Sequence, residues 1–555
     1  MSYNNVEANT GIDIVNLFKQ HFSNVYKLNN SINYEANNNY NISGNSLLSI
    51  NSINIPLMEV FNELWTIKPN HSTGPDNISP KFLKETAFIL SPIITFLYNK
   101  SIQTGIFPNT WKYSFISPIF KKGDKSLVTN YRPISKISIL PKIFSKLVNK
   151  IIFPLCNHIL INEQHGFRPK RSTITNLCLF KNSILDSFVD KAQIDVIYTD
   201  FEKAFDRVNH SLLIYKLKLY GFRDPLLSWL NSFLINRIQV VKYENFISNS
   251  INVLSGVPQG DHLSPLLFSF FINDINKVLN YSKCLLFADD TKIFKKIKCI
   301  DDSLELQADL DNIYKWCIRN GMSLNIDKCS IISYSLKKNT ILNNYVLHNT
   351  NLTRKYIIED LGVSFDSKLS FNNHVDFIRN KSYMKLGLLK RMCSDFNDSS
   401  VLKILYYSLV RSHIDYASLI WHSDSICQNQ SLSSIQNNFL RYLSFKCRFE
   451  RLPHSGYINI STFFNITPLN SRFKILNLKF LFKLLHNLID CPELLERINF
   501  NVNIKNSRNK HPFYLSIIKT NYMSYYPAII LMSCGNFFNN LDLFNMTLNS
   551  LNCYF

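Results

Sequence analysis

The stretch IDVIYTD (residues 194–200) is a β-branched run that ends on an acid, and FEKAFD (residues 201–206) follows it. A β-branched run of this length predicts a buried strand. A carboxylate at the C-terminal end of a strand, with a turn after it, lies where an α/β fold presents ligands to a crevice. Asp200 is therefore a candidate metal ligand. The alternative is a helix cap, since Asp often serves at strand-to-helix turns.

A second acidic site lies in KCLLFADDTKIF (residues 283–294), where two apolar runs flank Asp289 and Asp290. This pattern predicts a β-hairpin with the acid pair at its turn. Two adjacent carboxylates repel each other unless a positive charge lies beside them, so the pair is costly without a cation. The alternative is an acidic turn that faces solvent.

The two sites together indicate more than either does alone. Asp200 and the pair Asp289 and Asp290 offer oxygen ligands for two Mg²⁺ ions, which nucleotidyl transfer uses to activate a 3′-hydroxyl and to stabilise the leaving pyrophosphate. Hard cations prefer such ligands, and the sequence has no His/Cys cluster that would favour zinc.

The composition favours a polyanionic partner. The 555 residues carry 61 Lys and Arg against 40 Asp and Glu, a formal net charge of +21, and 46% of them are hydrophobic. A chain of this length predicts several domains with sizeable cores. The surplus charge favours nucleic acid first and an anionic membrane surface second. Twelve cysteines without a C-x-x-C pair indicate free thiols in a reducing compartment.

The pattern along the chain changes from mixed to helical. Apolar spacing predicts a short helix over residues 14–25, and residues 27–53 read as an Asn/Ser-rich linker. From residue 55 to about 332 helical segments alternate with short β-branched runs, which is an α/β or α+β pattern. The last third, from about residue 369, is predicted to be mainly helical. No signal peptide and no membrane-spanning segment are expected.

Nine short motifs follow one another in a recognisable order. They are STGPD (72–76), PIFKKGD (118–124), NYRPIS (130–135), QHGFR (164–168), DFEKAFD (200–206), GVPQG with LSPLLF (256–260 and 263–268), FADD (287–290), LNIDK (324–328) and LGVSFD (361–366). In content and order they resemble the reverse transcriptases of non-LTR (LINE-like, jockey-type) retrotransposons. The resemblance covers roughly residues 14–446.

The resemblance implies an α+β right-hand polymerase, with fingers, a palm built on an antiparallel sheet, and a helical thumb. Its expected boundaries are 1–54 for the short helix and linker, 55–368 for fingers and palm, 369–448 for thumb and post-thumb, and 449–555 for a C-terminal region of open role. The implied activity is RNA-directed DNA synthesis from dNTPs, with an RNA template, a DNA primer or target, and two Mg²⁺ ions for which Mn²⁺ could substitute. The family implies cytoplasm and nucleus as locations.

The family's residue roles pass onto matching positions of this chain. Asp200, Asp289 and Asp290 match the catalytic carboxylates, and the Phe201 carbonyl matches a further metal ligand. Carboxylates together with substrate phosphates are how Mg²⁺ is usually held.

The nucleotide site is implied by five further positions. Phe205 matches the ring that excludes a ribose 2′-hydroxyl, and Gln259 matches an amide that contacts the incoming nucleotide. Lys121 and Arg132 match the basic residues that meet the triphosphate. Lys328 falls where a cation can protonate the leaving pyrophosphate. The alternatives are a core aromatic at Phe205 and solvent-exposed cations at the basic positions.

Two further features concern the nucleic-acid strands. Leu361, Gly362 and Val363 resemble the primer grip, with Gly362 permitting close backbone approach. Downstream, Lys390, Arg391 and Arg411 are candidates to touch the backbone of the duplex. The alternative for each is a solvated cation.

The chain departs from the family at its N-terminal end. About 70 residues precede the STGPD motif, too few for the endonuclease that usually comes first, so a polymerase without its own nicking activity is expected. A rival interpretation is a silent or domesticated RNA-binding, maturase-like remnant. A third is an RNA-templated RNA polymerase, against which Phe205 and Ala288 argue.

Overall fold

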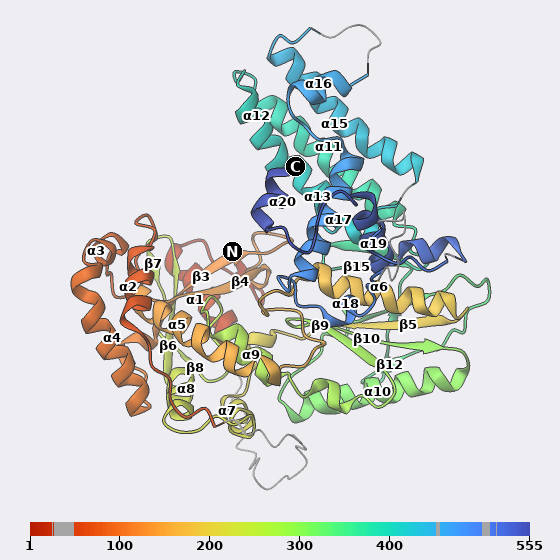
Figure 1. The fold of residues 1–555 in the computed structure, drawn as a ribbon. Coiled ribbons are helices and arrows are strands. Elements are labelled where there is room, and N and C mark those ends of the chain that lie inside the picture. Colours follow the sequence, from red (N-terminus) through yellow and green to blue (C-terminus); the bar gives the residue numbers. More distant parts are fainter. Residues whose placement is uncertain are drawn as a thin grey trace.

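The computed structural model describes residues 1–24, 26, 49–423, 425–450, 456–501, 511–517 and 519–554. Helices and strands are both abundant, and they form an α+β fold in which sheets lie among helices (Figure 1). This confirms the α+β class. The predicted Asn/Ser-rich linker lies largely outside the described residues.

The central sheet has the strand order β14-β11-β5-β10-β9. β5 (Gln193–Thr199) lies in the middle and is antiparallel to both β10 (Asp290–Ile297) and β11 (Ser330–Tyr334). β9 (Lys283–Phe287) forms one edge, and β14 (Thr353–Arg354) runs parallel to β11 at the other. The predicted strand and hairpin are both confirmed.

Each face of the central sheet supplies a different hydrophobic core, because side chains alternate along a strand. Val196 packs with Phe294 and with α6 (Thr173–Val189) on one face. Ile197 packs with Ile293 and with α10 (Ile300–Arg319) on the other. The two helices therefore cover opposite faces of the sheet, as Figure 1 shows, and the ends of the strands are left to form a site.

A second sheet has the order β4-β3-β6-β7, with β8 paired to β6. Its strands are β3 (Tyr113–Phe120), β4 (Tyr131–Lys136), β6 (Arg237–Tyr243), β7 (Phe246–Ile247) and β8 (Ile251–Val253). The N-terminal segment, with β1 (Ser2–Tyr3), β2 (Val6–Glu7) and α1 (Gly11–Ser23), packs on this sheet through its own small core. The helix predicted over residues 14–25 is thus found, and it begins three residues earlier.

Besides α1 and α6, seven more helices among the described residues of the first half surround these sheets. They are α2 (Leu57–Trp65), α3 (Pro80–Glu85), α4 (Ala87–Thr104), α5 (Ile139–Cys156), α7 (His210–Leu219), α8 (Leu226–Leu234) and α9 (Ser264–Phe271). Small strands β12 (Val346–Leu347) and β13 (Thr350–Asn351) pair beside α10, and the hairpin of β15 (Ile357–Asp360) and β16 (Val363–Asp366) leads into the helical part.

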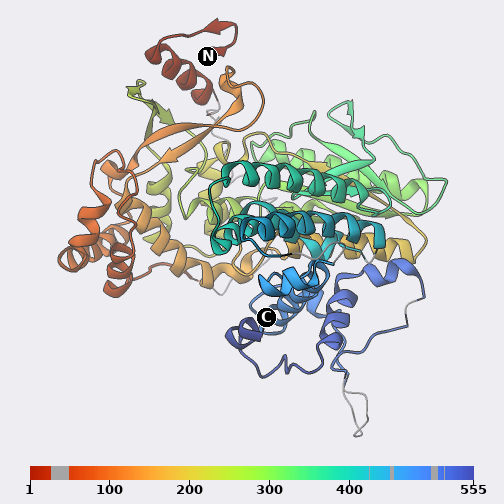
Figure 2. The same cartoon turned by 90° about the horizontal axis from the view of Figure 1, so that it is seen from above.

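After Asp366 the described residues contain helices and no further strand, as the sequence predicts. They are α11 (Asn372–Met392), α12 (Ser399–Tyr406), α13 (Ser412–Asp415), α14 (Ser418–Trp421), α15 (Ile426–Lys446), α16 (Ile458–Phe463), α17 (Leu469–Leu485), α18 (Pro492–Leu495), α19 (Pro527–Phe537) and α20 (Leu548–Tyr554). In the view of Figure 2 the C-terminal helices, drawn in blue, lie at the opposite edge from α1. Within the described ranges no helix is both long and apolar enough to cross a bilayer.

The prediction that Arg411 touches a duplex is wrong. Arg411 lies in a π-helical turn (Tyr407–Arg411) and is 3% exposed. Its guanidinium donates a hydrogen bond to the Thr467 carbonyl at 3.1 Å and forms an ion pair with Asp415. It joins helices to each other, whereas Arg391 at the end of α11 is exposed.

Candidate active site

The three predicted carboxylates lie together at one end of the central sheet. The register that pairs Thr291 with Thr199 places Asp290 beside Asp200 at the neighbouring strand end. The hairpin turn consists of Ala288 and Asp289, with Ala288 in the left-handed region at φ 59°, and Asp290 is already the first residue of β10. The turn therefore lies one residue earlier than predicted, with Asp289 as its second residue and Asp290 already in the strand.

The charges of the three carboxylates act on one another's surroundings. Burial raises the pKa of Asp289, and the negative charge of Asp200 raises it further. The pKa of Asp290 is raised to about 6, first by burial and then by Asp289, Asp200 and Asp360. Negative charges that raise the pKa of the neighbouring Asp289 and Asp290 also favour a bound cation.

The carboxylate oxygens of Asp200, Asp289 and Asp290 suit a metal ion that binds together with a substrate phosphate. They suit less well an ion that the protein would hold by itself. Among the residues that the structure describes, no group of three or more His, Cys, Asp or Glu side chains lies close enough together to hold a metal ion by itself. Mg²⁺ commonly takes one or two carboxylates and completes its shell with water and substrate phosphate. In this structure Lys328 Nζ lies 2.8 Å from Asp200 Oδ2, so a cation already neutralises that carboxylate.

The backbone after Asp200 is held by the segment before Lys328. The N–H of Glu202 donates to the Ser323 carbonyl, and the N–H of Asn325 donates to the Asp200 carbonyl, both at 2.8 Å. Neither of these two bonds uses the Phe201 carbonyl, which is the predicted metal ligand. The Phe201 side chain itself is buried.

Phe205 and Gln259 are connected by Asp206, which follows Phe205 in the chain and binds the Gln259 side chain. The Phe205 ring stacks on Phe268 with centroids 4.5 Å apart, and Phe167 meets it edge-on at 5.7 Å. Gln259 Nε2 donates to both Asp206 oxygens, at 2.8 and 2.9 Å. Burial raises the pKa of Asp206 to about 6. Sequence reasoning assigned no role to Asp206, although it ends the FEKAFD motif.

The hairpin of β3 and β4 brings the basic residues toward the carboxylates. Burial lowers the pKa of Lys121, and the charges of Arg132 and Lys328 lower it further while Asp200 opposes them. Arg132 in turn lowers the pKa of Asp289. The charges of these cations and of the acids therefore influence each other, which holds for Lys121, Arg132 and Lys328.

A cavity of about 420 Å³ opens beside the carboxylates. Its wall combines the ends of β5, β10 and β11 with the β15–β16 hairpin and one residue of the β3–β4 hairpin, Lys122. The lining includes Asp200, Asp290, Lys292, Lys328, Lys355, Asp360 and Leu361. Anionic and cationic side chains therefore face the same space.

Two of the predicted primer-grip residues, Leu361 and Gly362, form the turn of the β15–β16 hairpin, and Val363 begins β16. Leu361 and Gly362 both have positive φ, 47° and 81°, and the Leu361 carbonyl accepts a hydrogen bond of 2.7 Å from Tyr416 Oη. Val363 is fully buried in a core, so its side chain does not face the cavity. Asp360 before the turn forms an ion pair with Lys292 of β10, which ties this hairpin to the acidic one.

The QHGFR segment holds the acidic turn from behind. Gln164 is 2% exposed, and its amide accepts from the Ala288 N–H at 2.9 Å and donates to the Ala288 carbonyl at 3.1 Å. The N–H of Leu286 donates to the Glu163 carbonyl, and the N–H of His165 donates to the Leu286 carbonyl. A Cβ on Gly166 would lie 2.1 Å from the Ala288 nitrogen. Sequence reasoning quoted this motif but gave its residues no role.

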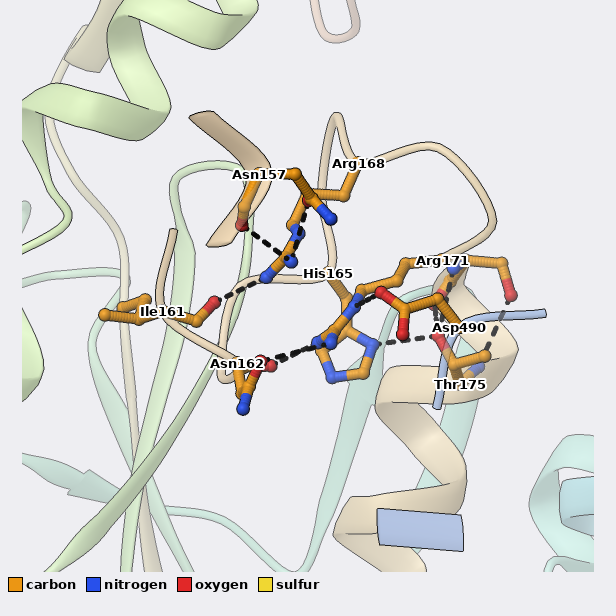
Figure 3. Close-up of polar contacts among 9 residues, drawn as sticks. Asn157, Ile161, Asn162, His165, Arg168, Arg171, Thr175 and Asp490 are labelled. Atoms are coloured by element: carbon orange, nitrogen blue, oxygen red, sulfur yellow. Dashed lines mark hydrogen bonds and ion pairs between the residues drawn. The ribbon is translucent and has the colours of Figure 1, made fainter. Parts of the chain in front are cut away.

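Two buried arginines fix the QHGFR segment in turn, as Figure 3 shows. Arg168 donates to the Ile161 carbonyl at 2.7 Å and to Asn157 Oδ1 at 2.9 Å. Arg171 donates to the Asn162 carbonyl and, through Nε, to Asp490 Oδ2 at 2.9 Å. Asp490 comes from the segment between α17 and α18. The C-terminal part of the chain therefore helps to hold the QHGFR segment, which in turn contacts the acidic turn.

Asp490→Ala is expected to lower the free energy of unfolding by about 2 kcal/mol, because Arg171 would keep a buried charge without its partner. The Arg171 side chain is 1% exposed. Urea denaturation of the variant and of Asp395→Ala, which removes an exposed acid, measures the difference. Equal midpoints for the two variants would show that the pair contributes nothing to stability.

A sheet that presents three acids at one end, near cations on a separate hairpin, offers both oxygen ligands for a metal and countercharge for phosphates. Residues 119–365 match the family model described as reverse transcriptase (RNA-dependent DNA polymerase). The match covers a little under half of the chain, and it confirms the resemblance to reverse transcriptases that its motifs indicate.

Curated relatives support the same family. The chain is 28% identical over 385 residues to the probable RNA-directed DNA polymerase from transposon X-element of Drosophila melanogaster, covering 68% of this chain and 42% of the relative. It is 26% identical over 406 residues to the RNA-directed DNA polymerase from mobile element jockey of the same species, covering 70% and 44%. The chain therefore spans less than half the length of these relatives.

Proposed function

We propose that the chain is an RNA-directed DNA polymerase that extends a DNA primer with deoxynucleotides on an RNA template. The observation that carries the proposal is the meeting of Asp200, Asp289 and Asp290 beside a cavity that Lys328 also lines. In this proposal the second sheet and its helices are the fingers, the central sheet is the palm, and α11 to α15 belong to the thumb.

The carboxylates and the Phe201 carbonyl would hold two Mg²⁺ ions, which activate the primer 3′-hydroxyl and stabilise the leaving pyrophosphate when bound. Lys328 would exchange its contact with Asp200 for the pyrophosphate and donate a proton to it. Arg132 and Lys121 would offset the charge of the triphosphate, since preorganised cations stabilise developing negative charge.

Selection of the sugar and the template would fall to Phe205 and Gln259. Because the Phe205 ring is clamped between Phe268 and Phe167, it cannot turn aside to admit a ribose 2′-hydroxyl. Asp206 would fix the Gln259 amide for the incoming nucleotide. The Leu361–Gly362 turn would hold the primer strand, braced by Tyr416.

Primer extension on poly(rA)/oligo(dT) tests the proposal. We expect incorporation of dTTP that requires Mg²⁺ or Mn²⁺, stops in EDTA, and exceeds incorporation of UTP by about a hundredfold, as a steric clash of a few kcal/mol predicts. A folded protein that binds RNA in a salt-dependent way without any incorporation would instead identify an RNA-binding remnant. A preference for UTP would identify an RNA polymerase.

A further inference from the structure

A second cavity lies away from the active site. It measures about 470 Å³ and opens between α6, the edge strand β9 and the C-terminal helix α18, which lie close together in Figure 1. It shares no lining residue with the cavity beside the carboxylates. The proposed polymerase activity leaves this space without a role.

Asn182 of α6 lines this second cavity with an unpaired amide. The residue is 2% exposed, and neither its Oδ1 nor its Nδ2 has a hydrogen-bond partner among the described residues. An unpaired buried polar group costs about 1–3 kcal/mol. A partner in the cavity would remove that cost.

Three further buried atoms in the lining also lack a partner within the described ranges. They are Asn276 Oδ1, Ser282 Oγ and Glu493 Oε2. Two of them only accept hydrogen bonds, so acceptors outnumber donors around this space. The lining therefore calls for an occupant that brings N–H donors.

The charge of the wall favours a cation. Asp186 is satisfied by a two-fold contact with Arg497, at 3.0 and 2.8 Å. Beyond that pair the lining carries Glu163, Glu493 and Glu496 against Lys283 alone. This excess of acid stands on a chain whose formal net charge is +21, so it is a local exception to the surface as a whole.

Leu179, Leu285 and Phe294 form an apolar part of the wall. An aromatic ring beside the acids adds a favourable surface for an amine or a guanidinium. We propose that this cavity binds a small organic cation, an alkyl amine or guanidinium on a short apolar chain. The source is either a free amine or an arginine side chain presented by another protein.

Calorimetric titration of agmatine into the full chain, free of nucleic acid, tests this site. We expect measurable binding that weakens about tenfold or more in Asn182→Leu and in Glu493→Gln, because each variant removes one polar contact to the bound cation. Glu85→Gln makes the same charge change at an exposed residue of α3 and should leave binding unchanged. A short arginine-containing peptide forms the second arm, and its binding would assign a protein side chain as the source, whereas binding of agmatine alone would assign a free amine.

Folding of the variants is checked by thermal melting. Asn182→Leu should melt at or above the wild-type temperature, since it replaces an unpaired buried amide with an apolar side chain of similar size. Glu493→Gln keeps the shape of the side chain, so it remains informative if Asn182→Leu unfolds. Absence of binding in the wild type, or binding that neither variant weakens, overturns the proposal. The measurement needs no polymerase activity.

Discussion

Asp289→Asn is expected to reduce dTTP incorporation about a thousandfold or more, since a metal-holding carboxylate contributes several kcal/mol to the transition state. The change keeps the size of the side chain and removes a negative charge that raises the pKa of the neighbouring Asp290. Steady-state primer extension measures the loss.

RNA affinity and stability should respond differently from activity in this variant. Affinity for a primed RNA template should change little, because binding depends on phosphate contacts by cations. The melting temperature should stay level or rise, since repulsion with Asp200 and Asp290 falls. Asp395→Asn makes the same change at an exposed position and should leave all three quantities unaltered. Retained synthesis in Asp289→Asn would contradict the metal assignment.

Gly166→Ala is the second change with a large expected effect. The added Cβ would lie 2.1 Å from the Ala288 nitrogen and 2.9 Å from the Phe287 carbonyl carbon, both of them backbone atoms of the acidic hairpin. Either the QHGFR segment or the turn must move, and overpacking of this kind costs about 1–3 kcal/mol. We expect a lower melting temperature together with a loss of incorporation of about tenfold or more, since small displacements of reacting groups are costly.

Gly387→Ala is the matched control for this substitution. Gly387 lies within α11, where an added Cβ would come no closer than 3.8 Å to an Arg391 side-chain atom. Alanine is favoured over glycine inside a helix by about 1 kcal/mol, so this variant should be at least as stable as the wild type. If Gly166→Ala melts and polymerises like Gly387→Ala, the QHGFR segment does not position the acidic turn.

Local patterns were sufficient for the elements that carry the acids. The β-branched run before Asp200 and the apolar runs around Asp289 and Asp290 became β5, β9 and β10 because strand propensity and burial agree there. The motifs also predicted the family. The roles of the site residues and the boundaries between subdomains stay predictions until the variants are measured.

Long-range contacts account for what the sequence did not predict. The bond between Arg171 and Asp490 joins residues 319 positions apart, and the one between Gln164 and Ala288 joins residues 124 apart. Arg411 is a further example, because a cation on a helix is normally solvated. Here its contacts with Asp415 and Thr467 bury it between helices, and the sequence pattern did not predict those contacts.

The sequence by itself determined the strands, the hairpin, the helical C-terminal third and the resemblance to reverse transcriptases, since these depend on side-chain periodicity and on motif order along the chain. Only the tertiary structure decided which side chains meet: Lys328 with Asp200, Asp206 with Gln259, and the C-terminal segment with the support of the acidic turn. The physical reason is that hydrogen bonds and ion pairs depend on distances of about 3 Å between atoms, which are fixed by packing and not by position in the sequence.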